Sequence, residues 1–354
     1  MKIAMSTPYY PPHIGGVEIH AKNLAEGLKS RGYEVVVVSS VGSDIVVPCI
    51  NVPYSPIPLV FPNIKADIYH SHVPSPFFAK NFAKLSERYK RPHVVTYHND
   101  VVIPARVNGC AVPALIARQI EKTNASIVTP ILERADVILA TTHSYAKTSQ
   151  ILTNYLEKVE VIPNAVNPDE FIPGVDAGNR RPIILYVGRL VEYKGVSLLI
   201  EAVADLQKEI DAKLVIVGDG EDRPKFEKLA EKLSVSATFT GKIPKKDVIE
   251  WMRRARILVL PSFSRLEAFG IVLLEAMACS TPVIAANVPG VSEVAKEGGM
   301  VFSSRVELVE KLKLILTNDK IATKLGKKGR RAVEKKYNWK IILNKVEKIY
   351  GELA

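Results

Sequence analysis

The sequence predicts an α/β protein made of two doubly wound domains, and three observations support this class. The chain has 354 residues, more than one hydrophobic core usually organises. Short apolar runs rich in β-branched residues alternate with helical stretches along the whole length. Many of these runs are apolar at nearly every position, which is typical of parallel strands covered by helices on both faces. The 47% hydrophobic and 24% charged fractions are those of an ordinary globular protein.

The elements can be placed in order along the chain. In the first half we expect strands at residues 2–6, 34–40, 67–72, 92–98, 136–142 and 159–163. The second half repeats the pattern, with strands at 182–188, 212–218, 237–241, 256–262, 281–287 and 300–302. Helices are expected between them at 17–31, 76–90, 196–210, 222–234, 245–255, 271–279 and 305–317, and a final helix at 339–353.

A segment rich in proline, glycine and polar residues, 162–182, separates the two sets of strands. We therefore expect a first domain of residues 1–168 and a second domain of residues 169–337. The final helix has no strand after it and could pack back on the first domain, which would then include residues 338–354.

The composition limits the classes of partner. A net charge of +11 and a pI near 9.3 admit nucleic acid, anionic lipid or a phosphorylated small molecule. Aromatic residues are not interleaved with the basic ones on a single face, so nucleic acid is not expected. The basic run at 323–336 is read as a solvated helix face, with a membrane-surface patch as the alternative.

Cysteines and apolar runs bear on the compartment. Cys49, Cys110 and Cys279 lie far apart and form no CxxC pair, so neither a disulfide framework nor a thiolate zinc site is indicated. No apolar run reaches about 18 residues and no signal-peptide pattern opens the chain. We expect a soluble protein of the cytoplasm, with peripheral contact at the inner membrane face as an alternative.

Open parallel sheets bind ligands beyond the carboxyl ends of their strands, so the loops at those ends carry the functional signal. After the first strand, "TPYYPPHIGGVEIH" places Gly15 and Gly16 at the start of a helix. Adjacent glycines let backbone N–H groups approach an anion, and a helix start favours phosphate. A simple tight turn is the alternative, because the fuller GxGxxG pattern is absent.

The second loop, "VGRLVEYKG", carries Arg189 and Lys194, with Gly188 and Gly195 beside them. A guanidinium can engage two oxygens of a diphosphate, and an ammonium adds a compact point charge. An exposed ion-pair surface is the alternative.

The third signal is the block "PSFSRLEAFGIVLLEAMACSTPVIA". Glu267 falls in the loop before a helix expected from Ile271, and Glu275 is a solitary carboxylate within that apolar helix. Because burying an unpaired carboxylate is costly, Glu275 needs hydrogen-bond donors. Sugar hydroxyls would serve, and so would a neighbouring arginine or lysine.

The fourth signal is His98, which ends the strand "VVTYH" and is followed by Asn99 and Asp100. The alternative is a loop histidine whose hydrogen bonds are made within the protein and which has no functional role. His70 and His72 alternate on another strand, but their spacing matches no HExxH-like site, so a metal centre is not expected.

In order and spacing, these motifs resemble the family-4 (group 1) glycosyltransferases. The resemblance rests on "GGVE", the histidine after a middle strand, "IPNAVNPDEF", "VGRLVEYKG", "VIVGDGED" and the two glutamates eight positions apart before "EAMACSTPVIAANVPGVSEV". It covers essentially the whole chain. It implies a GT-B fold, in which two Rossmann-like domains face each other across a cleft and the second mainly holds a nucleotide sugar. Ser280, where glycine is common, departs from the pattern, as do Ala165 and Asn167 in place of "PNGVD".

The resemblance also implies roles for individual residues. Arg189 and Lys194 would bind the donor diphosphate, Glu275 the ribose, Glu267 the donor sugar, and His98 the transferred sugar near the reaction centre. The backbone around Lys242 would meet the base. The catalytic set would be His98, Arg189, Lys194 and Glu267, and the donor-binding set Gly15, Gly16, Gly188, Arg189, Lys194, Gly218, Lys242, Glu267, Ala268, Phe269, Gly270, Ile271 and Glu275.

The implied reaction moves a hexose-type sugar from a nucleotide-diphosphate donor of unknown base to a hydroxyl of a glycan, lipid or small molecule, with retention of configuration. Fixed cations would stabilise the departing diphosphate, so neither a metal nor another cofactor is expected. A nucleotide-sugar epimerase or another GT-B enzyme is the alternative. The apolar segment 52–64 and the basic helix after it could give peripheral membrane contact, or could simply pack.

Overall fold

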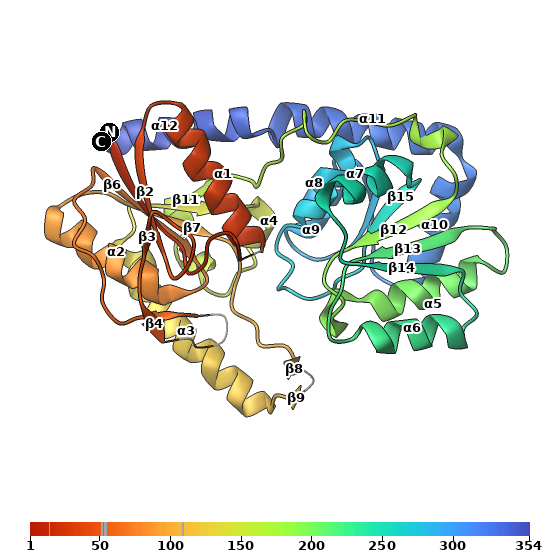
Figure 1. Ribbon diagram of the computed structural model, residues 1–354, viewed down its shortest axis with the longest axis horizontal. Helices are drawn as coiled ribbons and strands as arrows, with labels where there is room; N and C mark the ends of the chain where they lie inside the picture. Colours follow the sequence, from red (N-terminus) through yellow and green to blue (C-terminus); the bar gives the residue numbers. More distant parts are fainter. Residues whose placement is uncertain (14, 51, 53–54, 108–109) are drawn as a thin grey trace. The chain divides into compact units, whose positions relative to one another are not determined.

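The computed structural model describes residues 1–13, 15–50, 52, 55–107 and 110–354 (Figure 1). The chain forms two compact units, Met1–Asn164 with Trp339–Ala354, and Ala165–Asn338. The sequence predicts domain boundaries after residues 168 and 337, whereas in the structure the chain passes between the units after Asn164 and after Asn338. The final helix belongs to the first unit although the whole second unit precedes it in the chain.

The first unit is built on a parallel sheet in the order β11-β10-β7-β6-β1-β2-β3. Its long strands correspond to those predicted from the sequence. The strands are β1 (Lys2–Ser6), β2 (Glu34–Ser39), β3 (Ile45–Val46), β6 (Ile68–Val73), β7 (His93–Tyr97), β10 (Val137–Ala140) and β11 (Val159–Val161). Two short antiparallel pairs lie outside the sheet, β4 (Cys49–Ile50) with β5 (Ile57–Pro58) and β8 (Arg106–Val107) with β9 (Cys110–Ala111).

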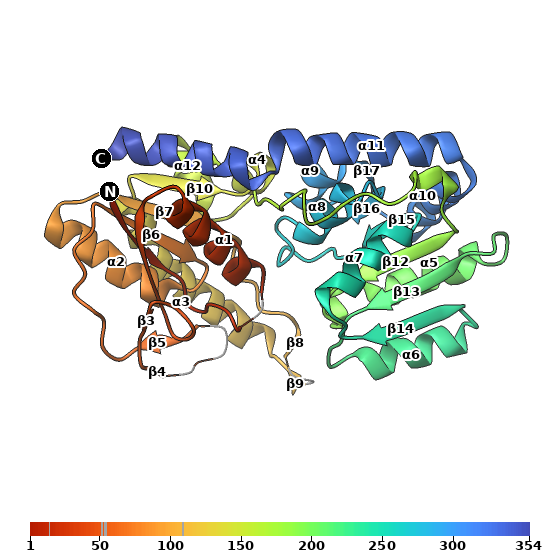
Figure 2. The ribbon, with the colours of Figure 1, turned by 45° about the horizontal axis from the view of Figure 1, so that its top comes forward.

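Helices cover both faces of this sheet: α1 (Gly16–Ser30) and α12 (Trp339–Leu353) contact each other, as do α2 (Pro76–Tyr89) and α3 (Ala114–Arg134) (Figure 2). Successive residues of β6 face opposite pairs of helices, because side chains alternate between the two faces of a strand. Tyr69 packs against Phe82 of α2, whereas His70 bonds to Tyr350 of α12. A short helix, α4 (His143–Ala146), and 3₁₀ turns at Leu152–Asn154 and Leu156–Lys158 complete the unit.

Helix α2 uses its apolar face within the fold. The sequence leaves open whether this basic helix contacts a membrane or packs, and Phe78 and Phe82 are fully buried in a core cluster with Tyr69 and Val38. Its apolar face is therefore used in folding. Pro53 and Tyr54, part of the other segment considered, lie outside the described residues.

The second unit has a parallel sheet in the order β14-β13-β12-β15-β16-β17. Its strands are β12 (Ile183–Val187), β13 (Lys213–Val217), β14 (Ala237–Gly241), β15 (Ile257–Leu260), β16 (Val283–Ala286) and β17 (Gly299–Phe302). Its helices are α5 (Val196–Leu206), α6 (Arg223–Lys232), α7 (Lys245–Arg254), α8 (Ile271–Ala278), α9 (Val291–Ala295), α10 (Arg305–Thr317) and α11 (Asp319–Lys336), with 3₁₀ turns at Ala177–Asn179 and Glu192–Lys194.

Strand alternation divides this unit into two apolar cores. Ile183 and Leu185 face a cluster supplied by α7, α8, α9 and α11, whereas Ile184 and Tyr186 face a cluster supplied by α5, α6 and α10. Helices on both faces of a parallel sheet make the doubly wound arrangement predicted from the sequence. Together the two parallel-sheet units confirm the expected fold class.

Two buried arginines tie the helices of the second unit together. Arg180 donates to the carbonyl oxygens of Met252, Ala255 and Cys279 at 3.3, 3.0 and 2.9 Å, which end α7 and α8. Such terminal carbonyls have no partner within their helix. Burial lowers the pKa of Arg180 to about 10, which leaves the guanidinium charged at neutral pH.

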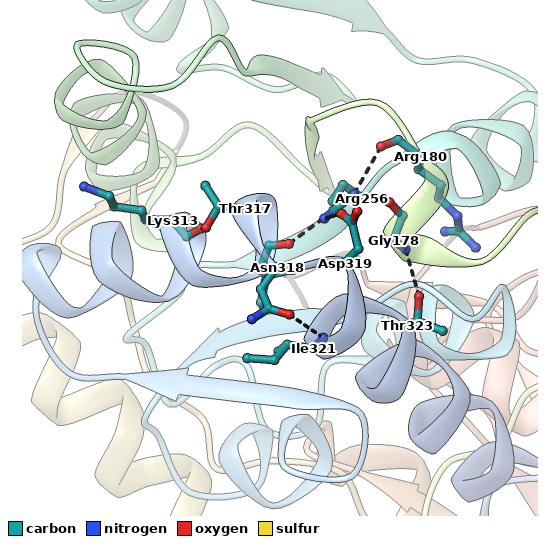
Figure 3. Close-up of polar contacts among 10 residues, drawn as sticks. Gly178, Arg180, Arg256, Lys313, Thr317, Asn318, Asp319, Ile321 and Thr323 are labelled. Atoms are coloured by element: carbon teal, nitrogen blue, oxygen red, sulfur yellow. Dashed lines mark hydrogen bonds and ion pairs between the residues drawn. The ribbon is translucent and has the colours of Figure 1, made fainter.

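The second buried arginine, Arg256, donates to the carbonyl oxygen of Ile315 at 3.1 Å and pairs with Asp319 at the start of α11 (Figure 3). Asn318 caps the same helix, since its side-chain oxygen accepts from the amide of Ile321 at 3.0 Å. These contacts lock α10 and α11 beside β15.

Ser280, where the family commonly has glycine, has a φ of 55°. This left-handed conformation favours glycine, so the family pattern reflects a real backbone requirement after α8.

Replacing Arg180 with alanine should strongly destabilise the second unit, because several buried carbonyl groups would lose their donor. We expect a loss of about 3 kcal/mol or more, and a melting temperature lower by roughly 10 °C in a thermal unfolding scan. Arg331→Ala, at an exposed position of α11, is the control and should change the melting temperature little. Equal melting of both variants would contradict this account.

Candidate active site

The candidate residues of the second unit gather at the carboxyl edge of its sheet. Strand order reverses between β12 and β15, and ligands of doubly wound sheets bind at such a switch point. The loop after β12 carries Gly188, Arg189 and Lys194, and the loop after β15 carries Glu267. The loops after β13 and β14 supply Gly218 and Lys242 at the same edge.

Glycines allow these loops to approach one another. Gly195 has a φ of 75°, and a Cβ atom there would lie 2.3 Å from the carbonyl oxygen of Pro261. A Cβ atom on Gly218 would lie 2.0 Å from the carbonyl oxygen of Gly188. Because no larger residue fits at either place, both glycines are needed to close the edge of the sheet.

An ion pair joins the two loops that flank the switch point. The ammonium of Lys194 hydrogen-bonds to the carboxylate of Glu267, and their side chains are only 20% and 14% exposed. Burial alone would lower the pKa of Lys194, but the attraction of Glu267 and the hydrogen bond to it outweigh burial and raise it. Lys194 is therefore a fixed positive charge at this site.

Arg189 differs from Lys194 in its surroundings. It is exposed, and it has no ion-pair partner among the described residues. Its carbonyl oxygen accepts a 2.8 Å hydrogen bond from the hydroxyl of Tyr186, which fixes the backbone of the loop. The guanidinium thus remains available to an anion.

Helix α8 begins beside Glu267. Gly270 precedes it with a φ of 75°, while Ala268 and Phe269 are buried, so the loop is held against the core. Ile271 is its first helical residue, and the first N–H groups of a helix lack partners within it. This helix start points its positive end toward the carboxyl edge of the sheet.

Glu275 lies one turn further along α8. It is half-buried, and burial raises the pKa of its carboxyl to about 7, despite the opposing charge of Lys245. Lys245 itself pairs with Glu170 at 2.6 Å. Among the described residues no hydrogen bond to the Glu275 carboxylate is formed, so the donors expected from its burial are not supplied by a neighbouring arginine or lysine.

In the first unit, Gly15 and Gly16 stand at the start of α1, in the loop that follows β1. The carboxylate of Glu18 occupies this helix start, since a Cβ atom on Gly15 would lie 2.2 Å from its Oε2 atom. Glu18 also bonds to the ring of His13 at 3.1 Å. A carboxylate is the kind of group that a helix start favours.

His98 follows β7 at the carboxyl edge of the same sheet and is buried. Its Nε2 atom lies 3.0 Å from Nδ1 of His72. Burial, with smaller contributions from His20 and His70, keeps the pKa of His98 well below its usual value. At neutral pH this imidazole is therefore uncharged.

Within the described residues, no group of three or more histidine, cysteine or acidic side chains is arranged to hold a metal ion.

Comparison with known families identifies the chain. The sequence profile described as "Glycosyl transferases group 1" matches residues 169–332, and the profile described as "Glycosyltransferase Family 4" matches residues 14–170. The chain belongs to the group 1 glycosyltransferases. It is therefore a transferase enzyme, as the resemblance of its motifs implied.

Relatives of this glycosyltransferase extend over its full length. An uncharacterised glycosyltransferase of Methanocaldococcus jannaschii is 29% identical, over 100% of this chain and 99% of that protein. Phosphatidyl-myo-inositol mannosyltransferase of Mycobacterium leprae is 26% identical, over 100% and 97%. The structure of HepE from Anabaena in complex with UDP aligns with a TM-score of 0.78 at 17% identity and covers 100% of both chains. This likeness supports the GT-B fold.

Sequence reasoning missed some partners of the candidate residues in this glycosyltransferase. Lys245, which lies near Glu275, carried no motif signal, and Glu170 stands in the quoted motif "IPNAVNPDEF" without having been given a role. His20 stands within the quoted glycine motif, four residues after Gly16, but its burial beside His98 could not be read from spacing. The mutual pairing of Lys194 and Glu267 was also not foreseen.

The raised pKa of Glu275 leads to a prediction about stability and pH. Between pH 4.5, the ordinary value, and pH 7 the folded protein keeps this carboxyl protonated while the unfolded chain ionises it. Stability should therefore fall as pH rises through this window. Glu275→Gln should abolish that loss and stabilise the protein by about 1–3 kcal/mol at pH 8.

Urea unfolding at pH 5 and pH 8 measures this effect. Glu310→Gln, at an exposed position of α10, is the matched control and should behave as the unaltered protein. The prediction fails if Glu275→Gln shows the same pH dependence as the control.

Proposed function

We propose that this glycosyltransferase moves a hexose-type sugar from a nucleoside-diphosphate donor to an acceptor hydroxyl, with retention of configuration and without a divalent metal ion. The main support is the switch point of the second unit, where Lys194, Arg189 and the start of α8 bring positive charge to one edge of the sheet. Negative charge develops at such a place when a diphosphate leaves the anomeric carbon.

The diphosphate would be bound by Arg189 and Lys194. Arg189 is exposed and can offer two parallel N–H donors, while Lys194 must share its charge between Glu267 and the phosphate. Each donor directed at the developing charge can lower the barrier by roughly 3 kcal/mol. The leaving phosphate would accept the proton of the attacking hydroxyl, which accords with retention.

The rest of the donor would extend over the neighbouring loops. Glu267 and the N–H groups from Phe269 to Ile271 would contact the sugar, and Glu275 would accept hydrogen bonds from the ribose hydroxyls. The Glu275 carboxylate has no other hydrogen bond among the described residues, which supports this role. Lys242, exposed beyond β14, would lie near the base.

Of the residues in the first unit, Gly15 and Gly16 are proposed to contact the diphosphate, for which the Glu18 carboxylate would have to leave the start of α1, and His98 to contact the transferred sugar. A UDP-hexose is the donor to test first, because HepE, which shares the fold, was solved with UDP.

Arg189→Ala and Lys194→Ala should each lower turnover of UDP-glucose about 100-fold without loss of folding, since each removes a charge that stabilises the leaving group. UDP release is the measurement, with Arg331→Ala as the control. Addition of a chelator should leave turnover of the unaltered protein unchanged. Wild-type rates in both variants, or a rate abolished by the chelator, would contradict the proposal.

We also propose that the acceptor is presented at an anionic lipid surface. No helix among the described residues is long and apolar enough to span a membrane. However, Leu115 and Ile116 at the start of α3 are 82% and 53% exposed, with Arg118 and Lys122 exposed in the same two turns. Apolar side chains flanked by cations suit peripheral contact with anionic lipid.

Co-sedimentation with vesicles tests this contact. The protein should bind vesicles that contain phosphatidylserine and lose most binding when Leu115 and Ile116 are both changed to aspartate. Vesicles of phosphatidylcholine alone should bind weakly. Undiminished binding of the double variant would exclude α3 as the contact.

A further inference from the structure

Four histidines form a buried cluster in the first unit. His20 lies on α1, His70 and His72 on β6, and His98 directly after β7, and all are almost completely buried. The ring of His72 stacks on those of His70 and His98, with centroids 4.8 and 5.3 Å apart. The ring of His20 meets His98 edge-on at 5.1 Å. Only His98 has been given a role in the proposed reaction.

Helix α12 anchors the inner end of this cluster. His70 bonds through Nδ1 to the hydroxyl of Tyr350 at 2.5 Å and through Nε2 to the hydroxyl of Thr96 at 2.7 Å. Both ring nitrogens of His70 are therefore engaged, and the ring cannot turn. The ring of His72 lies stacked between this fixed ring and that of His98 and is oriented by its hydrogen bond to His98.

The cluster is uncharged. Burial lowers the pKa of His20 to about 4 and that of His70 to about 3, and it keeps the pKa of His72 well below its usual value. A neutral imidazole carries one N–H donor and one acceptor nitrogen. What His98 can do for a ligand therefore depends on which of its two nitrogens carries the proton.

Hydrogen bonding at His98 is asymmetric. Its Nε2 atom is bonded to Nδ1 of His72 at 3.0 Å. Its Nδ1 atom has no partner among the described residues and is not among their fully enclosed unpartnered atoms. Nδ1 is therefore the nitrogen that can meet a ligand.

His72 decides the tautomer of its neighbour. Its Nε2 atom is enclosed and has no partner among the described residues. If His98 donated to His72, the proton of His72 would have to sit on this enclosed Nε2 atom as an orphaned donor, which proteins rarely tolerate. If His72 donates from Nδ1, its Nε2 atom is only an unpaired acceptor. The second arrangement is favoured.

We infer that His72 is a positioning residue that donates its Nδ1–H to Nε2 of His98, so that His98 presents an Nδ1–H donor to an oxygen of the transferred sugar. The part of this inference that concerns the sugar rests on the proposed function. The part that concerns the tautomer concerns the ligand-free protein alone.

The tautomer can be read directly from ¹⁵N shifts of the imidazole nitrogens in protein labelled at histidine, with the spectrum of His98→Gln assigning the His98 signals. We expect His98 to be protonated on Nδ1. His72→Asn places an amide N–H near the position of Nδ1 and should preserve this state. His72→Phe keeps a ring but no donor and should release His98 to the Nε2-protonated form.

Turnover should follow the tautomer. Release of UDP from UDP-glucose should stay within about threefold of the unaltered protein in His72→Asn and fall roughly 10- to 100-fold in His72→Phe, in kcat rather than in UDP affinity. His93→Phe is the control, because His93 is also buried, bonded through one nitrogen to Ser71 at 2.9 Å and unpartnered at the other, but does not touch His98. It should leave both readouts unchanged.

The outcomes separate this inference from the proposed function. An Nε2-protonated His98 in the unaltered protein, or unchanged His98 shifts in His72→Phe, would overturn the inference. If His72→Phe does not fold, the unaltered protein and His72→Asn still report the tautomer. If UDP and UDP-glucose do not bind the unaltered protein, the proposed function fails, while the ¹⁵N shifts still decide the role of His72.

Discussion

Close backbone contact between the loops that follow β12 and β15 is the constraint on which the second unit depends. Gly195 fits against the carbonyl group of Pro261 only because it has no side chain. Ser262 donates to the carbonyl oxygen of Tyr193 at 2.9 Å, and Lys194 pairs with Glu267 across the same gap. Without this approach, neither the cations nor the start of α8 would share one edge of the sheet.

The same constraint explains why charged side chains can be concentrated here. A parallel sheet ends all of its strands on one side, so loops distant in sequence meet there. At the opposite edge, Arg180 and Arg256 serve folding by satisfying helix ends. The two edges therefore differ in function. Buried arginines hold the helices at one edge, whereas the exposed Arg189 and the Glu267-paired Lys194 place positive charge at the other.

The sequence predicted the long strands and most of the helices because their apolar periodicity is strong. It missed α3, which has a proline at position 130 and an exposed first half, so no apolar face marks it. Most of the candidate residues could be selected from the sequence because glycine, arginine and glutamate stand in loops that follow predicted strands. The pairing of Lys194 with Glu267 could not be predicted, because it joins residues 73 positions apart.

Helix α12 has a consequence for biosynthesis. A nascent chain leaves the ribosome amino terminus first, yet Tyr350, the partner of His70, is made only after the entire second unit. Until α12 has been synthesised, the apolar side chains of the first unit that it covers stay exposed to solvent. A chain whose synthesis stops before α12 would therefore have an incomplete first unit with exposed apolar surface, which chaperones and proteases recognise.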